Sequence, residues 1–127
     1  MSRDVIVPEE NQNQYQNFHF ASAVRSSGLL LCSGQIGAGA DGIPDSVEEE
    51  FQNAWKAIGK VLEEAGLTYD DILEYTSYHV NMHDHLGTFM KVRDKFVSEP
   101  WPAWTAIGIT ELAIPGARVE IRVTAGC

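Results

Sequence analysis

The chain has 127 residues, of which 44% are hydrophobic and 21% charged, and its formal net charge at pH 7 is −9. These values are typical of one soluble globular domain, here residues 1–127, that is large enough to form a core without disulfides. Phosphate binding needs concentrated lysine and arginine, and the nine basic residues form no cluster, so we expect no nucleic-acid partner.

No apolar run approaches the roughly 18 residues of a membrane span, so we also expect no membrane partner. The two cysteines, Cys32 and Cys127, do not form a disulfide framework. Reduced thiols in a cytoplasmic protein are the simpler interpretation.

The first elements predicted are β-strands. Residues 11–17 are polar and loop-like, whereas residues 18–24 and 29–32 are two apolar runs separated by a turn at Gly28. This pattern predicts an antiparallel hairpin whose second strand continues through residues 33–37 into a glycine-rich loop. Residues 4–7 allow one further short strand at the start of the chain.

A long amphipathic helix follows. Ser46 with Glu49 three residues later is a capping-box pattern, and Gly66 ends the helical periodicity. The predicted core stripe of this helix consists of Val47, Phe51, Ala54, Ile58, Val61, Leu62 and Ala65.

The second half of the chain predicts a strand, a helix and two more strands. Residues 71–82 have strand-like composition, Asp84 can cap a helix that ends before Pro100, and residues 104–110 and 118–125 form the last strands. The apolar face of this helix comprises Leu86, Phe89, Met90 and Phe96. We therefore expect an α+β fold in which one mixed sheet carries both helices on one face.

The last strand distinguishes the two faces of that sheet. Its alternation places Val119, Ile121, Val123 and Ala125 beneath the helices, and Arg118, Glu120, Arg122 and Thr124 on the opposite face. We expect Trp104, Leu29 and Leu31 on that second face as well. A face of this mixed polarity predicts a subunit interface with a semi-polar cleft.

Other chemistry in the sequence is weaker. The spacing of His79, His83 and His85 matches no zinc motif, so we interpret them as surface and cap residues and expect no metal or cofactor. Ser33 has no histidine and aspartate partners at a recognisable spacing and is better read as a hydrogen-bonding hydroxyl. Strand alternation directs Cys32 into the core, away from reactive chemistry.

Several short motifs, in order, resemble the RidA (YjgF) family of imine deaminases. They are Ser33-Gly34-Gln35-Ile36, Glu64-Ala65-Gly66-Leu67, Asp71-Ile72, Pro102-Ala103 and Val119-Glu120-Ile121. Residues 22–26 and 104–110 are most similar to the YjgH-like branch of that family. The resemblance implies a chorismate-mutase-like fold and a homotrimer that binds small molecules in three clefts between subunits.

The same resemblance implies a set of site residues. In active members an arginine holds the carboxylate of a 2-imino acid, and a glutamate positions the water that attacks the C=N carbon. The glutamate corresponds to Glu120 and the serine of the cleft to Ser33. The remaining cleft positions, where the family has tyrosine, asparagine, cysteine and arginine, are Phe20, Met90, Ala106 and Trp104.

Trp104 in place of arginine changes the chemistry expected. An indole offers one N–H donor and a π face, and it cannot make the bidentate contact of a guanidinium with a carboxylate. We therefore predict weak or absent deamination of 2-imino acids. Arg122, two residues from Glu120, could supply a displaced guanidinium or only an interface ion pair, while Arg118 is expected to be solvent-exposed. Trp104 itself could contact either a ligand or a neighbouring subunit.

Two functions follow. The first is a deaminase or related hydrolase that uses Glu120 to orient water and acts on a small imine or enamine. The second is a non-catalytic trimeric protein that binds a metabolite or regulates its use. The endoribonuclease or translation-inhibitor function attached to some family members is disfavoured by the charge of −9.

Overall fold

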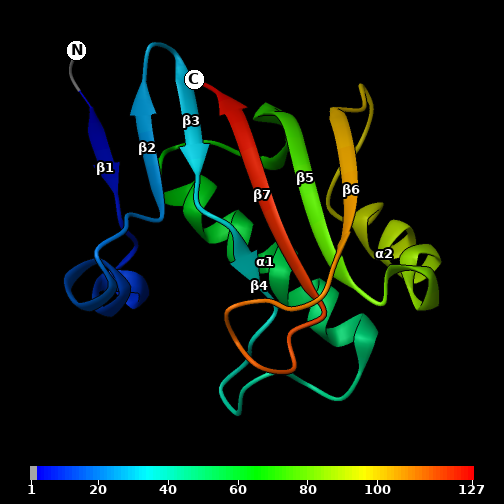
Figure 1. Cartoon of the computed structure of the whole chain (residues 1–127). Coiled ribbons are helices and arrows are strands. Elements are labelled where there is room, and N and C mark those ends of the chain that lie inside the picture. The colour runs from blue at the N-terminus through cyan, green and yellow to red at the C-terminus, as the bar shows by residue number, and fades with distance from the viewer. Residues whose placement is uncertain (1–2) are drawn as a thin grey trace.

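One mixed sheet organises the chain in the computed structural model, which describes residues 3–127. Its strands are β1 (Asp4–Ile6), β2 (Ala23–Ser26), β3 (Leu29–Cys32), β4 (Gln35–Ile36), β5 (Ile72–Val80), β6 (Ala103–Ile109) and β7 (Val119–Gly126). The spatial order is β1-β2-β3-β7-β5-β6, with β4 also paired to β7 (Figure 1). Only the β5–β6 pair is parallel among these described pairings.

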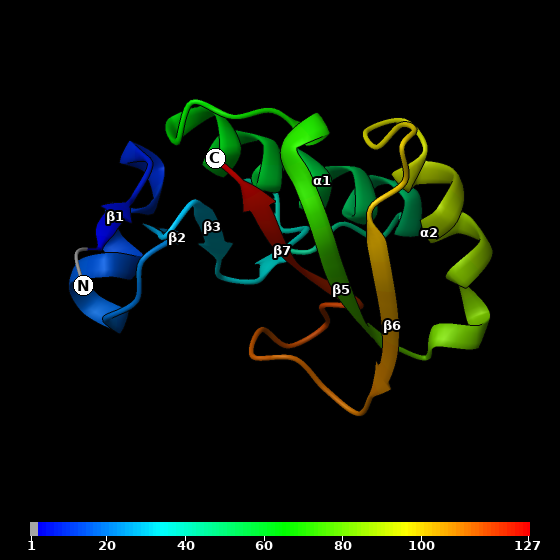
Figure 2. The same ribbon diagram turned by 90° about the horizontal axis from the view of Figure 1, so that it is seen from above.

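Two main helices, α1 (Val47–Glu64) and α2 (Leu86–Arg93), cover the same face of this sheet (Figure 2). Short helical turns occupy Glu9–Asn11, Gln14–Phe18, Tyr69–Asp71 and Met82–Asp84. The predicted α+β architecture, a mixed sheet with both helices on one face, is confirmed. The opposite face has no helix of the described chain packed on it, and we call it the open face.

The long helix α1 forms as the sequence predicts. The Ser46 hydroxyl accepts a hydrogen bond from the Glu49 backbone N–H at 3.2 Å, and Gly66 follows the helix with a φ of +78°, a conformation that glycine adopts without strain. Phe51, Ala54 and Ile58 are almost fully buried against the sheet. Trp55, outside the predicted stripe, is also fully buried, so the apolar face is wider than predicted.

Several predicted boundaries are wrong. Residues 18–22 are not a strand, because a helical turn reaches Phe18 and the hairpin begins only at Ala23. The second helix begins at Leu86 after His85 and ends at Arg93, so Asp84 does not cap it. In both places short local turns replace the regular element that the apolar pattern suggested.

An ion pair around a buried carboxylate joins α1 to the loop before β7. Glu50 is fully buried, and its carboxylate accepts hydrogen bonds from the Arg118 backbone N–H at 2.7 Å and from Arg118 Nε at 2.6 Å. The same guanidinium donates to the backbone carbonyls of Pro44 and Asp45. The expectation that Arg118 is solvent-exposed is therefore wrong, because the guanidinium is needed to compensate the buried Glu50 carboxylate.

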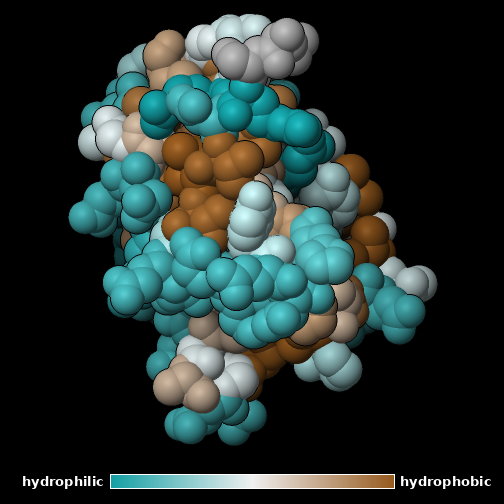
Figure 3. Space-filling model, turned by 90° about the vertical axis from the view of Figure 1, so that its left-hand side faces the viewer, coloured by the Kyte–Doolittle hydropathy of each residue, from teal (hydrophilic) through white to brown (hydrophobic). Residues whose placement is uncertain are grey.

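The open face exposes apolar side chains on its β1–β3 side. Val5, Val24 and Leu31 are cross-strand neighbours in register, and Val5 and Leu31 are exposed, as is Leu29. A view from the β1 edge shows an apolar area bordered by hydrophilic residues (Figure 3).

Among residues 3–127, no helix combines the length and apolar character needed to cross a membrane.

Arg118→Met leaves the Glu50 carboxylate buried without its cation, so we expect a loss of about 3 kcal/mol in the free energy of unfolding. Chemical denaturation measures this loss. The matched control is Lys95→Met, which removes the exposed ion pair of Lys95 with Glu48 and should cost less than about 1 kcal/mol. Equal losses of unfolding free energy in the two variants would show that the Glu50–Arg118 pair stabilises the fold no more than an exposed pair does.

Candidate functional site

Glu120 lies on the open face of β7. Its backbone is in register with Ile36 of β4 and Tyr78 of β5. Its carboxylate passes over Gly34, where an added Cβ would lie only 2.5 Å from Oε2, so the close approach requires glycine at position 34. Ser33 is the next residue, and its hydroxyl donates to the Ala21 carbonyl at 2.6 Å. Glu120 and Gly34 therefore form one local group, with Ser33 next to Gly34 in the chain.

Trp104 lies on the other face of the sheet, under α2. Its indole N–H donates to the Ser77 hydroxyl at 2.8 Å. Its ring is nearly parallel to the rings of Tyr75 and Phe89, with both centroid distances 5.9 Å. The prediction that Trp104 shares a face with Glu120 is thus wrong. Trp104 is in register with Tyr75, whose side chain is buried on the helix face.

The register of β5 separates the two groups. β5 lies between β6 and β7, and Tyr75 and Ser77 face the helices whereas Thr76 and Tyr78 face the opposite way. Ala106 is opposite Ser77 and therefore shares the face of Trp104. Arg122 is opposite Thr76 and shares the face of Glu120. Within one chain, the predicted site residues form two groups on opposite faces of the sheet.

An arginine from α2 completes the group around Trp104. The guanidinium carbon of Arg93 lies 5.1 Å from the centroid of the Trp104 ring and 6.0 Å from that of Trp101. Arg93 also donates to the Tyr75 hydroxyl at 3.3 Å and to the Asp94 carboxylate at 3.0 Å. Burial by itself lowers the pKa of Arg93, but these two partners more than offset it, so the net shift is upward and the guanidinium stays charged.

Two histidines lie inside this half of the molecule. His79 is fully buried and its Nε2 lies 2.7 Å from the Ser77 hydroxyl, while the ring of the buried His85 is 5.5 Å away. Because an indole N–H can only donate, Ser77 accepts from Trp104, and its hydroxyl is also in hydrogen-bond contact with His79. Burial, and next the proximity of His85, lowers the pKa of His79 to about 4.

The interpretation of His79 as a surface residue is therefore wrong, whereas His83 is exposed as expected. His85 precedes α2 at its cap position but is buried. The strand alternation of β5 determines the outcome for His79, since residues 75, 77 and 79 all point into the core. Within residues 3–127, no group of three or more histidine, cysteine or acidic side chains is arranged to hold a metal ion.

The remaining predicted residues are more dispersed. Phe20 is 43% exposed and lies outside the strands, and Arg122 is exposed on β7. Met90 is half-buried on α2, where its neighbour Phe89 is the residue that packs on Trp104. None of the ion pairs within residues 3–127 involves Glu120 or Arg122. Cys32 is buried as predicted, and burial raises the pKa of its thiol to about 12.

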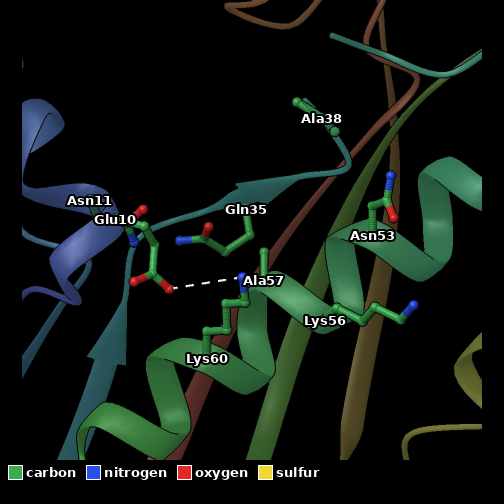
Figure 4. Close-up of a pocket in the computed structure, with 9 residues that line it drawn as sticks. Glu10, Asn11, Gln35, Ala38, Asn53, Lys56, Ala57 and Lys60 are labelled. Carbon is green, nitrogen blue, oxygen red and sulfur yellow. Dashed lines mark ion pairs between the residues drawn. The ribbon is translucent and has the colours of Figure 1, made fainter. Parts of the chain in front are cut away.

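A hollow of about 290 Å³ lies elsewhere, between α1, β4 and the N-terminal helical turns (Figure 4). It is bordered by an ion pair between Lys60 and Glu10, whose charged atoms are 3.9 Å apart. Its lining contains none of the predicted site residues and consists of Glu10, Asn11, Gln35, Ala38, Gly39, Asn53, Lys56, Ala57 and Lys60.

The polar and aromatic residues that surround Trp104 were not predicted from the sequence. Two patterns could have identified them. Tyr75, Ser77 and His79 alternate along the predicted strand, and Phe89 and Arg93 lie four residues apart on the predicted helix, hence on one helical face.

The chain is similar to known proteins along most of its length. A family model described as "Endoribonuclease L-PSP" matches residues 12–127. The protein named "RutC family protein YjgH" from Escherichia coli (strain K12) is 34% identical over 98% of this chain and 95% of its own. A 2-iminobutanoate/2-iminopropanoate deaminase from Mus musculus is 29% identical, covering 84% of this chain and 79% of the mouse protein.

A solved structure titled "Structural Genomics, Protein YJGH" superimposes with a TM-score of 0.87 and 34% identity. The match covers 99% of this chain and 97% of the other. Because both the sequence and the fold agree over nearly the whole chain, these findings bear on the family and not only on the architecture.

His79 gives a testable pH dependence. A pKa of about 4 in the folded chain is below the ordinary value of 6.5, so the unfolded chain binds the proton more readily. Stability should therefore fall as the pH drops from 6.5 to about 4, by roughly 3 kcal/mol from this residue.

The measurement is chemical denaturation across this pH range for the natural chain, His79→Asn and His83→Asn. We expect His79→Asn to lose less stability on acidification than the natural chain, whereas His83→Asn, at an exposed position, should match the natural chain. An unchanged slope in His79→Asn would contradict the assignment.

Proposed function

Because the chain belongs to the RidA (YjgF) family, we propose that it is a hydrolytic deaminase of small imines or enamines, with Glu120 as the catalytic carboxylate. The observation that carries this proposal is the position of Glu120 on an open sheet face, with its carboxylate against Gly34. The deaminase named among the relatives supports the reaction class.

The chemistry asked of Glu120 is limited. Its carboxylate accepts a hydrogen bond from a water molecule and takes up a proton as the water oxygen bonds to the C=N carbon. The π electron pair of the C=N bond moves to nitrogen, and Glu120 returns its proton to that nitrogen. In the resulting aminol, Glu120 takes the hydroxyl proton and passes it to the amino nitrogen, so that the C–N bond breaks, ammonia leaves and a carbonyl compound remains. The step needs no redox cofactor, since carbon keeps its oxidation state.

The site proposed is a cleft between copies of the chain. The Glu120 group and the Trp104 group lie on opposite faces of the sheet, so one chain cannot bring them to the same ligand. A neighbouring copy can place its Trp104 edge, on strand β6, against the Glu120 face. The exposed Leu29 and Leu31 on the open face support self-association, because such side chains gain stability when they are covered.

Short 2-imino acids are poor substrates in this proposal. The N–H of Trp104 is already used by Ser77, and its ring already packs on Tyr75, Phe89 and Arg93. Position 104 therefore offers no donor to a carboxylate next to the reacting carbon. Nucleic acid is not a proposed substrate, because the chain carries a net charge of −9.

The first test is Glu120→Gln. Imines are generated in solution from a panel of amino acids with an amino-acid oxidase, and their hydrolysis is followed with and without the protein. We expect the variant to lose at least about 100-fold in turnover, because an amide cannot accept the proton. Glu63→Gln, an exposed position on α1, is the matched control. Ligand binding without turnover in the natural chain would favour a binding or regulatory protein instead.

The second test is Leu31→Glu, which places a charge on the exposed apolar row of the open face. We expect self-association and turnover to be lost together, while circular dichroism shows a folded chain, since each copy then has an incomplete cleft. Sedimentation velocity and the imine assay measure the two effects. Full turnover by a monomeric Leu31→Glu would contradict a cleft between copies.

A further inference from the structure

Arg93 is the charged residue that packs on the aromatic side chains around Trp104. Its guanidinium lies over two indoles, Trp101 and Trp104, and is tied to Tyr75 and Asp94. Its side chain is only 18% exposed, whereas that of Asp94 is 54% exposed. A cation in these partly dry surroundings attracts an anion more strongly than a lysine in open solvent does.

The guanidinium also retains hydrogen-bonding capacity. It carries five N–H groups in a planar fork. One nitrogen contacts the Tyr75 hydroxyl, and the other two lie within 3.0 Å of the same oxygen of Asp94. These three contacts leave N–H groups that can donate to a second acceptor. Asp94, as the more exposed partner, is the one that a ligand carboxylate can displace.

We propose that Arg93 binds the acidic end of the ligand in the Trp104 half of the cleft, so that the preferred substrates are imines or enamines with a carboxylate several bonds away from the reacting carbon. The substrate assignment rests on the proposed function, whereas the anion site at Arg93 does not. The charge comes from α2 and lies beyond the Trp104 ring, with 5.1 Å between the guanidinium carbon and the ring centroid.

The other arginine near the proposed cleft does not offer the same site. Arg122 is exposed on β7, on the face of Glu120, so an anion held there would lie beside the catalytic carboxylate and be repelled by it. Arg93 is on the opposite face of the sheet, away from Glu120 in its own chain. In a cleft between copies, the two charges would then approach the ligand from different subunits, with the acidic end and the reacting carbon kept apart.

The test is equilibrium binding of hexanoate and of its neutral analogue hexanamide to the intact protein. Calorimetry gives the affinities, and a change in tryptophan fluorescence, to which Trp55 also contributes, reports on Trp101 and Trp104. We expect hexanoate to bind about tenfold more tightly than hexanamide, because its contact with the guanidinium is charge-assisted. Arg93→Gln should abolish this preference, and Lys91→Gln, an exposed cation of the same helix, should preserve it.

Asp94→Asn leaves the guanidinium in place and should raise the affinity for hexanoate, whereas Arg93→Gln should lower it. It removes the internal competitor, so hexanoate should bind several-fold more tightly, and this result decides the matter even if Arg93→Gln fails to fold. The proposal is overturned if the natural chain shows no preference for hexanoate, if the preference survives in Arg93→Gln, or if Arg122→Gln abolishes it instead. None of these measurements requires turnover, so they stay informative if the deaminase function fails.

Discussion

The alternation of side chains along β5 is the constraint on which the rest of this molecule depends. β5 is the interior strand between β6 and β7, and both neighbours are held to it by backbone hydrogen bonds in fixed register. Tyr75, Ser77 and His79 must therefore enter the layer beneath the helices, and Thr76 and Tyr78 must face away from it. This register places Trp104 and Glu120 on opposite faces, although both belong to the motifs that carry the family resemblance.

The same constraint explains what Trp104 does within the chain. An indole on the helix face meets Ser77, which accepts its N–H, and a set of aromatic rings from β5 and α2. Trp104 therefore packs at the edge of the core, and its ring is not free to stack on a ligand. It also holds Arg93 by a cation–π contact, so an indole from β6 and a guanidinium from α2 meet at this edge of the sheet.

The buried polar groups also depend on partners that come from distant parts of the chain. Glu50 is surrounded by the helix layer, and its charge is compensated only because Arg118 folds back from the start of β7. The guanidinium then reaches the carbonyls of Pro44 and Asp45, so one residue connects α1, the loop before it and the loop before β7. His79 and Ser77 complete the polar interior next to Trp104, in a neutral state that requires no counter-ion.

The sequence by itself determined the α+β architecture, the two helices on one face, the stripe of α1 and the burial of Cys32. These features follow from local periodicity and capping, which the chain carries residue by residue. It also determined the family, through motifs that keep their order and spacing. The tertiary structure alone decided the pairing of the buried Glu50 with Arg118 and the separation of Trp104 from Glu120. Those outcomes depend on strand order, register and the partner that a buried charge or hydrogen-bonding group finds across the fold, and no local pattern specifies such partners.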